Sequence, residues 1–183
     1  MTLTPAERAH QDLLARWRKA MDLVGPGPIE PHFTDAARAV DALGPITGRW
    51  ADLGSGAGFP GVALAARNPG ATVLLVESRR KRATFLDTVV AQAPLPNATV
   101  ANARTEDLEG PFDGLISRAY KAPEGVLLDA ARLLGPGGRV ALMLGDGDWT
   151  PPPGWRVVAS ARYPVEDGHR RLIVVGQGDP SRM

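Results

Sequence analysis

The stretch that decides the fold is ADLGSGAGFPG, residues 51–61. An apolar run ends at Leu53, glycines follow at alternate positions, and Pro60 suits the opening turn of a helix. Gly54, Gly56 and Gly58 allow a sharp backbone turn, and they let a ligand approach where a Cβ atom would clash. A turn of this kind after a strand is typical of the carboxyl edge of a parallel sheet, where open α/β folds bind their ligands.

Outward from this loop, short apolar runs alternate with helical stretches from Arg49 to Gly145. Five strand patterns are readable in this range, which predicts a parallel sheet covered by helices on both faces. Residues 146–154, DGDWTPPPG, are too short and too rich in proline for a crossover helix. The strand patterns WRVVASARYP and HRRLIVVG follow, joined by VEDG as a hairpin. We therefore predict a Rossmann-like α/β fold, with a mostly parallel seven-stranded sheet and a C-terminal antiparallel hairpin.

Two helices precede the sheet. Thr4 and Glu7 fit a capping box at a helix start, with Pro5 at the first helical position. Apolar residues recur at helical spacing as far as Trp17 and Met21, which places Trp17 on the expected buried face. The proline- and glycine-rich segment 24–31 ends this helix, and a second helix is expected over residues 31–43.

The composition is that of a globular chain. It has 183 residues, 44% of them hydrophobic and 22% charged, with a formal net charge of +1. This balance excludes a disordered chain and does not indicate a globally basic nucleic-acid binder. No apolar run approaches the ~20 residues of a bilayer helix, and no signal peptide is readable, so we expect a cytoplasmic protein. Because cysteine is absent, disulfides, thiolate zinc sites and cysteine nucleophiles are excluded.

The loop's spacing bears on its ligand. A dinucleotide fingerprint needs a third glycine at position 59, where this chain has Phe59. The glycines instead follow a G-x-G-x-G pattern with Asp52 two residues ahead, the spacing of S-adenosylmethionine-dependent methyltransferases. Glu77 ends the second strand, where a carboxylate can accept hydrogen bonds from both ribose hydroxyls. NAD enzymes use the same arrangement, so Glu77 does not discriminate, and a tight turn without a ligand is the alternative.

Several further segments carry a family resemblance. In order, they are RKAMDLVGPGPIEPHFTDA at 18–36, the glycine loop, LLVESRRKRATFL at 74–86, RTED at 104–107, ISRA at 116–119 and LGPGGRVALMLG at 134–145. Together they resemble the small-subunit ribosomal RNA methyltransferase G family, also called GidB. The resemblance implies a class I enzyme that methylates N7 of guanine 527 in 16S rRNA from S-adenosylmethionine. It also implies an N-terminal helical extension packed on the core, a methyltransferase domain and a short tail, which we place at residues 1–45, 46–176 and 177–183.

The resemblance assigns site residues to this chain. Thr105 and Glu106 would lie by the adenine, Glu77 would hold the ribose, and Arg118 would stand beside the methyl donor and the target base as the catalytic residue. The alternative for Arg118 is an ion pair with Asp113 or Glu106. The full expected cofactor set is Asp52, Gly54, Gly56, Gly58, Phe59, Glu77, Thr105, Glu106 and Arg118.

The chemistry of guanine N7 agrees with the residues present. N7 has a free lone pair and no proton to lose, so attack on a methyl sulfonium needs no general base, and positioning and electrostatics suffice. His10, His32 and His169 lie far apart in the sequence, and none has a motif partner. Arg118 is expected to orient O6 of the guanine or a phosphate, because N7 must stay free.

Basic residues supply candidate RNA contacts, with 16S rRNA or the small ribosomal subunit as the expected partner. Arg79 to Arg82 open a helix as a local cluster, for which a solvated helix end is the alternative. His32 is expected either to stack on a base or to have a structural role, supported by Asp35 three residues further on. The full set is Arg16, Lys19, His32, Arg79, Arg80, Lys81, Arg82, Lys121, Arg170 and Arg171. We expect a monomer without a metal ion.

The chain departs from the family pattern at three places. Asp22-Leu23-Val24 replaces the usual Asn-Leu-Thr, Leu144 replaces a lysine before Gly145, and the helix after the fifth strand is missing. The last two lie near the expected substrate side. Two alternatives therefore stay open: a class I methyltransferase with a changed RNA or small-molecule substrate, and a module that binds S-adenosylmethionine or RNA without transfer.

Overall fold

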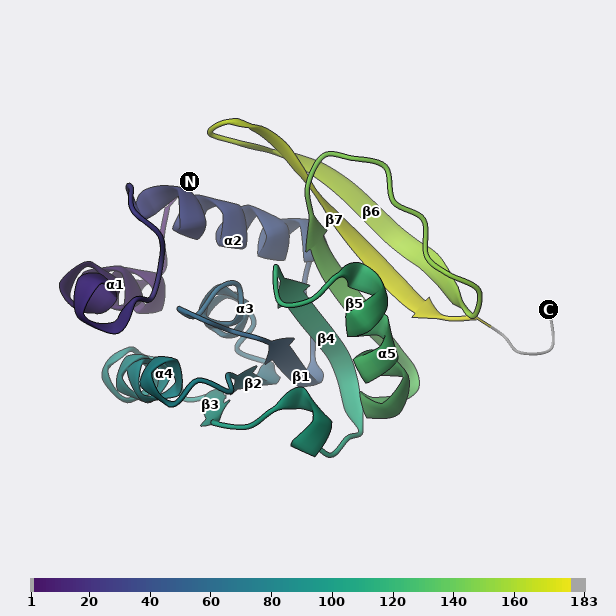
Figure 1. Ribbon diagram of the computed structural model, residues 1–183, viewed down its shortest axis with the longest axis horizontal. Coiled ribbons are helices and arrows are strands. Elements are labelled where there is room, and N and C mark those ends of the chain that lie inside the picture. The colour runs from purple at the N-terminus through teal and green to yellow at the C-terminus, as the bar shows by residue number, and fades with distance from the viewer. Residues whose placement is uncertain (1, 179–183) are drawn as a thin grey trace.

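A computed structural model describes residues 2–178 of the chain. A single sheet of seven strands has the order β3-β2-β1-β4-β5-β7-β6. The first five strands pair in parallel, and β7 is antiparallel to both β5 and β6. The strands are β1 (Gly48–Leu53), β2 (Ala71–Val76), β3 (Ala98–Ala101), β4 (Phe112–Arg118), β5 (Leu134–Leu144), β6 (Trp155–Val165) and β7 (Gly168–Gln177). The predicted fold class and the terminal hairpin are confirmed (Figure 1).

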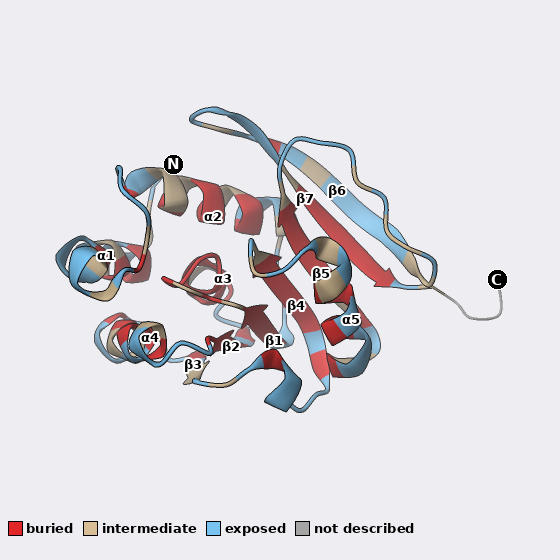
Figure 2. Ribbon diagram, viewed as in Figure 1, coloured by how far each residue is buried: buried red, intermediate tan, exposed pale blue. Residues whose placement is uncertain are grey.

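Helices cover both faces of the sheet. The helices are α1 (Pro5–Met21), α2 (Glu30–Leu43), α3 (Gly61–Arg67), α4 (Arg80–Gln92) and α5 (Pro123–Leu133), with a short 3-10 helix η1 (Thr105–Asp107). One hydrophobic core lies between the sheet and α1 to α4, and a second lies between the sheet and α5. The central strands β1, β2 and β4 and the later parts of β5 and β7 are mostly buried, whereas most of β6 and the outer faces of α1 and α5 are exposed (Figure 2).

The chain order reverses next to β1, because β2 and β3 lie on one side of it and β4 on the other. The carboxyl ends of β1, β2 and β4 therefore meet at a topological switch point, where ligands of open α/β sheets bind. The connection after β3 contains only η1, three residues long, in place of a full helix. No helix forms between β5 and β6, as the proline-rich segment predicts.

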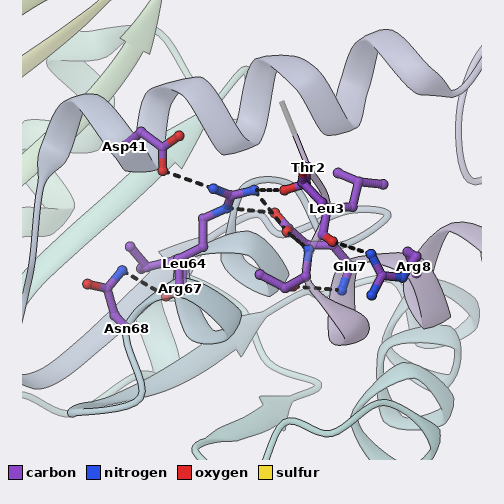
Figure 3. A network of polar contacts seen from close by, with 9 residues as sticks. Thr2, Leu3, Glu7, Arg8, Asp41, Leu64, Arg67 and Asn68 are labelled. Carbon is purple, nitrogen blue, oxygen red and sulfur yellow. Dashed lines mark hydrogen bonds and ion pairs between the residues drawn. The ribbon is translucent and has the colours of Figure 1, made fainter.

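The N-terminal helices are joined to α3 by a partly buried polar network around Arg67 (Figure 3). Thr4 and Glu7 form the predicted capping box, with Thr4 N–H donating to Glu7 at 2.7 Å. The same Glu7 carboxylate accepts from Arg67 Nε at 2.9 Å and Nη2 at 3.0 Å, while Arg67 Nη1 donates to Asp41 at 3.0 Å. Arg67 of α3 thus connects α1 with α2.

Two predictions, on the burial of Trp17 and on where the tail begins, differ from the structure. Trp17, expected on the buried face of α1, is 39% exposed. The predicted tail at residues 177–183 begins with the last residue of β7, and its part from residue 179 onward lies outside the described residues. Among the described helices, none is long and apolar enough to cross a membrane.

Candidate functional site: a pocket at the carboxyl edge of the sheet

A pocket of about 430 Å³ opens at the carboxyl ends of β1, β2 and β4. The sequence-predicted residues Gly54, Glu77, Thr105 and Glu106 line it together. Asp52, Gly58 and Phe59 lie behind this surface and are buried, and Gly56 is joined to the pocket by its hydrogen bond to Glu77. The structure also adds Tyr120, which sequence reasoning did not single out.

The glycine loop needs residues without a side chain. Gly54 and Gly58 have φ angles of +73° and +100°, which favour glycine. A Cβ atom on Gly54 would lie 2.4 Å from the ring of Tyr120, and one on Gly58 would lie 2.9 Å from the ring of His10. The loop backbone is therefore packed tightly on both sides.

Glu77 connects the loop with the start of α4. Its Oε2 accepts from Gly56 N–H at 3.1 Å, and its Oε1 accepts from Arg79 N–H at 2.7 Å. Each carboxylate oxygen has a second lone pair, so Glu77 can accept further hydrogen bonds from a ligand in the pocket. The two backbone donors fix the carboxylate at the pocket wall, although Glu77 itself is only 6% exposed.

Asp52 is completely buried at the end of β1. Its Oδ2 accepts from Gly61 N–H at 2.9 Å, but its Oδ1 has no hydrogen-bond partner among the described residues. Burial raises the pKa of Asp52 to about 6, although the Gly61 hydrogen bond and the charge of Arg118 act in the opposite direction. A buried carboxylate oxygen without a partner is costly, and it can accept a donor that the chain itself does not supply.

His10 of α1 contacts the glycine loop on the side away from the pocket. The sequence did not predict this contact, because His10 has no motif partner. Its Nε2 lies 2.7 Å from the carbonyl oxygen of Ala57, which only accepts, so Nε2 carries the hydrogen. The ring is 1% exposed and packs against Phe33 and Phe59 at 4.9 and 5.0 Å between centroids. Burial lowers the pKa of His10 to about 4, so the imidazole is neutral at neutral pH.

Arg118 ends β4, and its partner differs from both expected ones. Its Nη1 donates to Asp35 Oδ2 of α2 at 3.2 Å, and its guanidinium lies 4.8 Å from the ring centre of Phe59. Asp113 accepts instead from Arg49 N–H, and Glu106 accepts from Lys121. The alternative of an ion pair with Asp113 or Glu106 is therefore wrong, because α2 brings a carboxylate that is 83 residues distant in sequence.

His32 lies on the other side of Phe59. The two ring centres are 5.6 Å apart, and the imidazole is half-buried. Burial, and then the charge of Arg118, lower the pKa of His32, so this imidazole is also neutral at neutral pH. Asp35 makes no hydrogen bond to His32 within residues 2–178 and binds Arg118 and Tyr163 instead. The structural pairing expected for these neighbours on α2 is replaced by contacts between elements.

The basic residues divide into two groups. Lys19 and the four residues Arg79 to Arg82 line one surface hollow of about 380 Å³, and Arg79 and Arg82 also border the main pocket. We call these five residues the basic hollow. Arg16 is exposed on α1 but does not line it.

The other basic residues are held by carboxylates. Lys121 binds Glu106 at 3.2 Å and Asp129 at 3.0 Å. On β7, Arg171 binds Asp148 at 3.2 Å, and Arg170 lies 3.5 Å from Asp35. Each of these three cations therefore lies beside a carboxylate, and an RNA contact by any of them stays a prediction.

The family model GidB, rRNA small subunit methyltransferase G, matches residues 6–149. The chain belongs to this family. It is 36% identical over 175 residues to the ribosomal RNA small subunit methyltransferase G of Xanthomonas campestris pv. campestris, covering 89% of this chain and 82% of that protein. The protein of the same name in an Azoarcus species is 34% identical over 182 residues, covering 93% and 85%.

A solved structure supports the fold. M. jannaschii TYW2 in complex with AdoMet matches with a TM-score of 0.63 and 14% identity, covering 82% of this chain and 76% of that one. The methyltransferase G family thus accounts for the Rossmann-like sheet and for the segments that carried the resemblance.

Three residues of the site were not predicted from the sequence: His10, Tyr120 and Tyr163. They act through contacts between elements, and no local motif signals such contacts.

Proposed function

We propose that this chain transfers a methyl group from S-adenosylmethionine to N7 of a guanine in 16S rRNA, guanine 527 in the family's numbering. One observation carries the proposal. The chain is a member of the methyltransferase G family, and a pocket with Glu77 on its wall lies at the switch point of its sheet. Arg118 ends β4, the strand that pairs with β1 at this switch point. A chain that acts on the small ribosomal subunit works in the cytoplasm, and one copy supplies every residue used below.

The polar groups of the pocket fit this cofactor. When bound, S-adenosylmethionine supplies an electrophilic methyl group on a positively charged sulfur. Glu77 has lone pairs left for two ribose hydroxyls, because its backbone donors use only one lone pair of each oxygen. Asp52 lies buried behind the pocket wall, and its Oδ1, which lacks a partner within residues 2–178, can accept a hydrogen bond from a water that bridges to the ammonium of the methionine part.

Other residues suit the adenine. Thr105 and Glu106 of η1 border the pocket, as does Tyr120, whose hydroxyl lies 2.6 Å from Thr105 Oγ1. The carbonyl of Thr105 accepts from Arg132 at 2.7 Å, which fixes the backbone of η1. Glu106 is exposed and keeps an oxygen available beside its contact with Lys121. We therefore place the adenine between η1 and the glycine loop.

Arg118 then orients the target base. Guanine N7 attacks through its lone pair without losing a proton, so no residue needs to act as a general base. The Arg118 guanidinium lies 4.8 Å from the ring centre of Phe59 and uses Nη1 for its Asp35 contact, so further N–H groups remain for O6 of guanine, the acceptor next to N7. His32 is neutral and adds no positive charge that would repel the methyl donor.

The basic hollow is the proposed RNA contact. Two of its five cations, Arg79 and Arg82, also line the cofactor pocket. An RNA backbone bound across the basic hollow would therefore run up to this pocket. The net charge of +1 conceals this local concentration. Binding through such contacts weakens steeply with salt.

The proposal is tested by incubating the protein with labelled S-adenosylmethionine and small ribosomal subunits from a strain that lacks this methylation. Label in 16S rRNA that disappears in Arg118→Ala is the expected result. The matched control is Arg156→Ala, an exposed arginine of β6 outside the site. No label in 16S rRNA with the wild type, or full labelling by Arg118→Ala, contradicts the proposal.

A second candidate is a methyltransferase with a changed substrate. It is favoured by the connection between β5 and β6, which has no helix, and by Leu144 at the end of β5. This candidate is tested by incubating the protein with naked RNA fragments, or with a small-molecule extract of cells, under the same labelling conditions. Label in either of them, without label in 16S rRNA, would support it.

A further inference from the structure

Arg118 owes its position to a carboxylate from another part of the chain. It is the last residue of β4, so the sheet fixes its backbone but not its long side chain. Asp35 Oδ2 and the Phe59 ring hold the guanidinium, at 3.2 Å and 4.8 Å. Asp35 itself is 5% exposed, because its side chain lies on the side of α2 that faces the β6–β7 hairpin.

The second oxygen of Asp35 is fixed by a tyrosine. Tyr163 Oη of β6 donates to Asp35 Oδ1 at 2.9 Å, and Tyr163 is 5% exposed. Burial, and then the neighbouring Asp35 carboxylate, raise the pKa of Tyr163, so its hydroxyl stays protonated and remains a donor. With Oδ1 held by Tyr163, the carboxylate cannot rotate, and Oδ2 stays directed at Arg118.

The hairpin's register makes this contact possible. Tyr163 of β6 pairs directly with Arg170 of β7, so the two side chains lie on one face of the hairpin. Both reach Asp35, but Arg170 Nε lies 3.5 Å from Oδ2 and its side chain is 44% exposed. Arg170 therefore shares the oxygen that Arg118 uses and does not hold the other one. A slip of one residue in this register would turn Tyr163 away from α2.

We propose that Asp35 and Tyr163 are positioning residues for methyl transfer, which hold the Arg118 guanidinium over Phe59 at the carboxyl end of β4. The inference rests on the proposed function, because it concerns the geometry of the same reaction. Neither residue is proposed to touch the cofactor or the RNA. Their effect on the rate passes through Arg118.

The test compares Tyr163→Phe, which removes only the hydroxyl, with Ser160→Ala, which removes an exposed hydroxyl from the same strand. Because a displacement of about 1 Å in a positioned group can cost up to about 100-fold, we expect kcat on small subunits to fall about tenfold in Tyr163→Phe. The calorimetric Kd for S-adenosylmethionine and the KM for the subunit should each change by less than about twofold. Ser160→Ala should match the wild type.

A double-mutant comparison separates positioning from general support of the fold. If Tyr163 acts through Arg118, then Tyr163→Phe should lower single-turnover rates by less than about twofold in an Arg118→Lys background. A tenfold loss in both backgrounds means that the hydroxyl has a merely structural role, and it overturns the proposal. Asp35→Asn, which keeps the side chain's shape, is the second variant and should lower kcat at least as much as Tyr163→Phe.

Crystal structures give a readout that does not depend on activity. The wild type should show Arg118 over Phe59, and Tyr163→Phe should show the Asp35 carboxylate rotated and Arg118 displaced. An unmoved Arg118 in the variant overturns the proposal, as does wild-type kcat in Tyr163→Phe. Absence of transfer by the wild type contradicts the proposed function instead, and the crystal structures then decide the positioning claim alone.

Discussion

Arg67 offers a sharp test of how the N-terminal helices are held on α3. Its guanidinium makes two contacts with Glu7, at 2.9 and 3.0 Å, and its side chain is 15% exposed against 2% for Glu7. In Arg67→Met, the Glu7 carboxylate stays buried, and its remaining contact with the Thr4 N–H does not neutralise its charge. Removing one partner of a buried pair costs about 3–5 kcal/mol, and the partial exposure of Arg67 places the expected loss near the lower end, at about 3 kcal/mol.

The assay is equilibrium urea unfolding followed by tryptophan fluorescence, with equal m-values required for the comparison. Glu7→Gln combined with Arg67→Met should recover most of the loss, because glutamine keeps the capping box and leaves no buried charge. Arg162→Met is the matched control, since Arg162 makes a similar pair with Asp146 on an exposed surface and should lose far less. A loss below about 1 kcal/mol in Arg67→Met, or no recovery in the double variant, refutes the reasoning.

Three further predictions concern the pocket and its loop. Glu77→Gln should weaken S-adenosylmethionine binding by about 1–3 kcal/mol in calorimetry, and unchanged affinity would contradict the ribose contact. Asp52 has a pKa raised to about 6, so cofactor affinity should fall about fivefold between pH 6 and pH 5 as the carboxylate gains a proton, and Asp52→Asn should lose this dependence. If the cofactor affinity of Asp52→Asn depends on pH as steeply as that of the wild type, Asp52 does not interact with the cofactor. The pKa of His10 is lowered to about 4 from 6.5, so the folded state binds fewer protons, and stability due to His10 is lost as the pH falls between these values. The loss approaches about 3 kcal/mol, so His10→Phe should be less sensitive to acid than the wild type in urea unfolding, and parallel curves would argue against a buried neutral imidazole.

Much of the fold follows from local patterns. The glycine loop, the alternation of strands and helices, and the proline-rich segment before the hairpin each have a physical signature within about ten residues. The capping box at Thr4 is equally local, and it forms as predicted. These features predicted the sheet, its hairpin and the place of the pocket.

The partners of the charged side chains could not be predicted in this way. Glu7 reads as a cap residue, yet it also binds Arg67, 60 positions away. The alternative considered for Arg118 was an ion pair with Asp113 or Glu106, but Arg118 binds Asp35, which Tyr163 holds from 128 positions away. His10 lacks any motif partner because its acceptor is a backbone carbonyl of the glycine loop, and a carbonyl leaves no trace in the sequence. Such contacts depend on how elements pack, which no single stretch encodes.

The most direct test of the account is to map the modified nucleotide. Small subunits that lack the methyl group are incubated with the protein and S-adenosylmethionine, and their 16S rRNA is then treated with borohydride and aniline, which cleave at N7-methylguanosine. We expect one cleavage, at a single guanine, that is absent when Arg118→Ala replaces the wild type. Methylation without cleavage, or cofactor binding without methylation, would contradict the claim that this pocket and Arg118 direct methyl transfer to guanine N7.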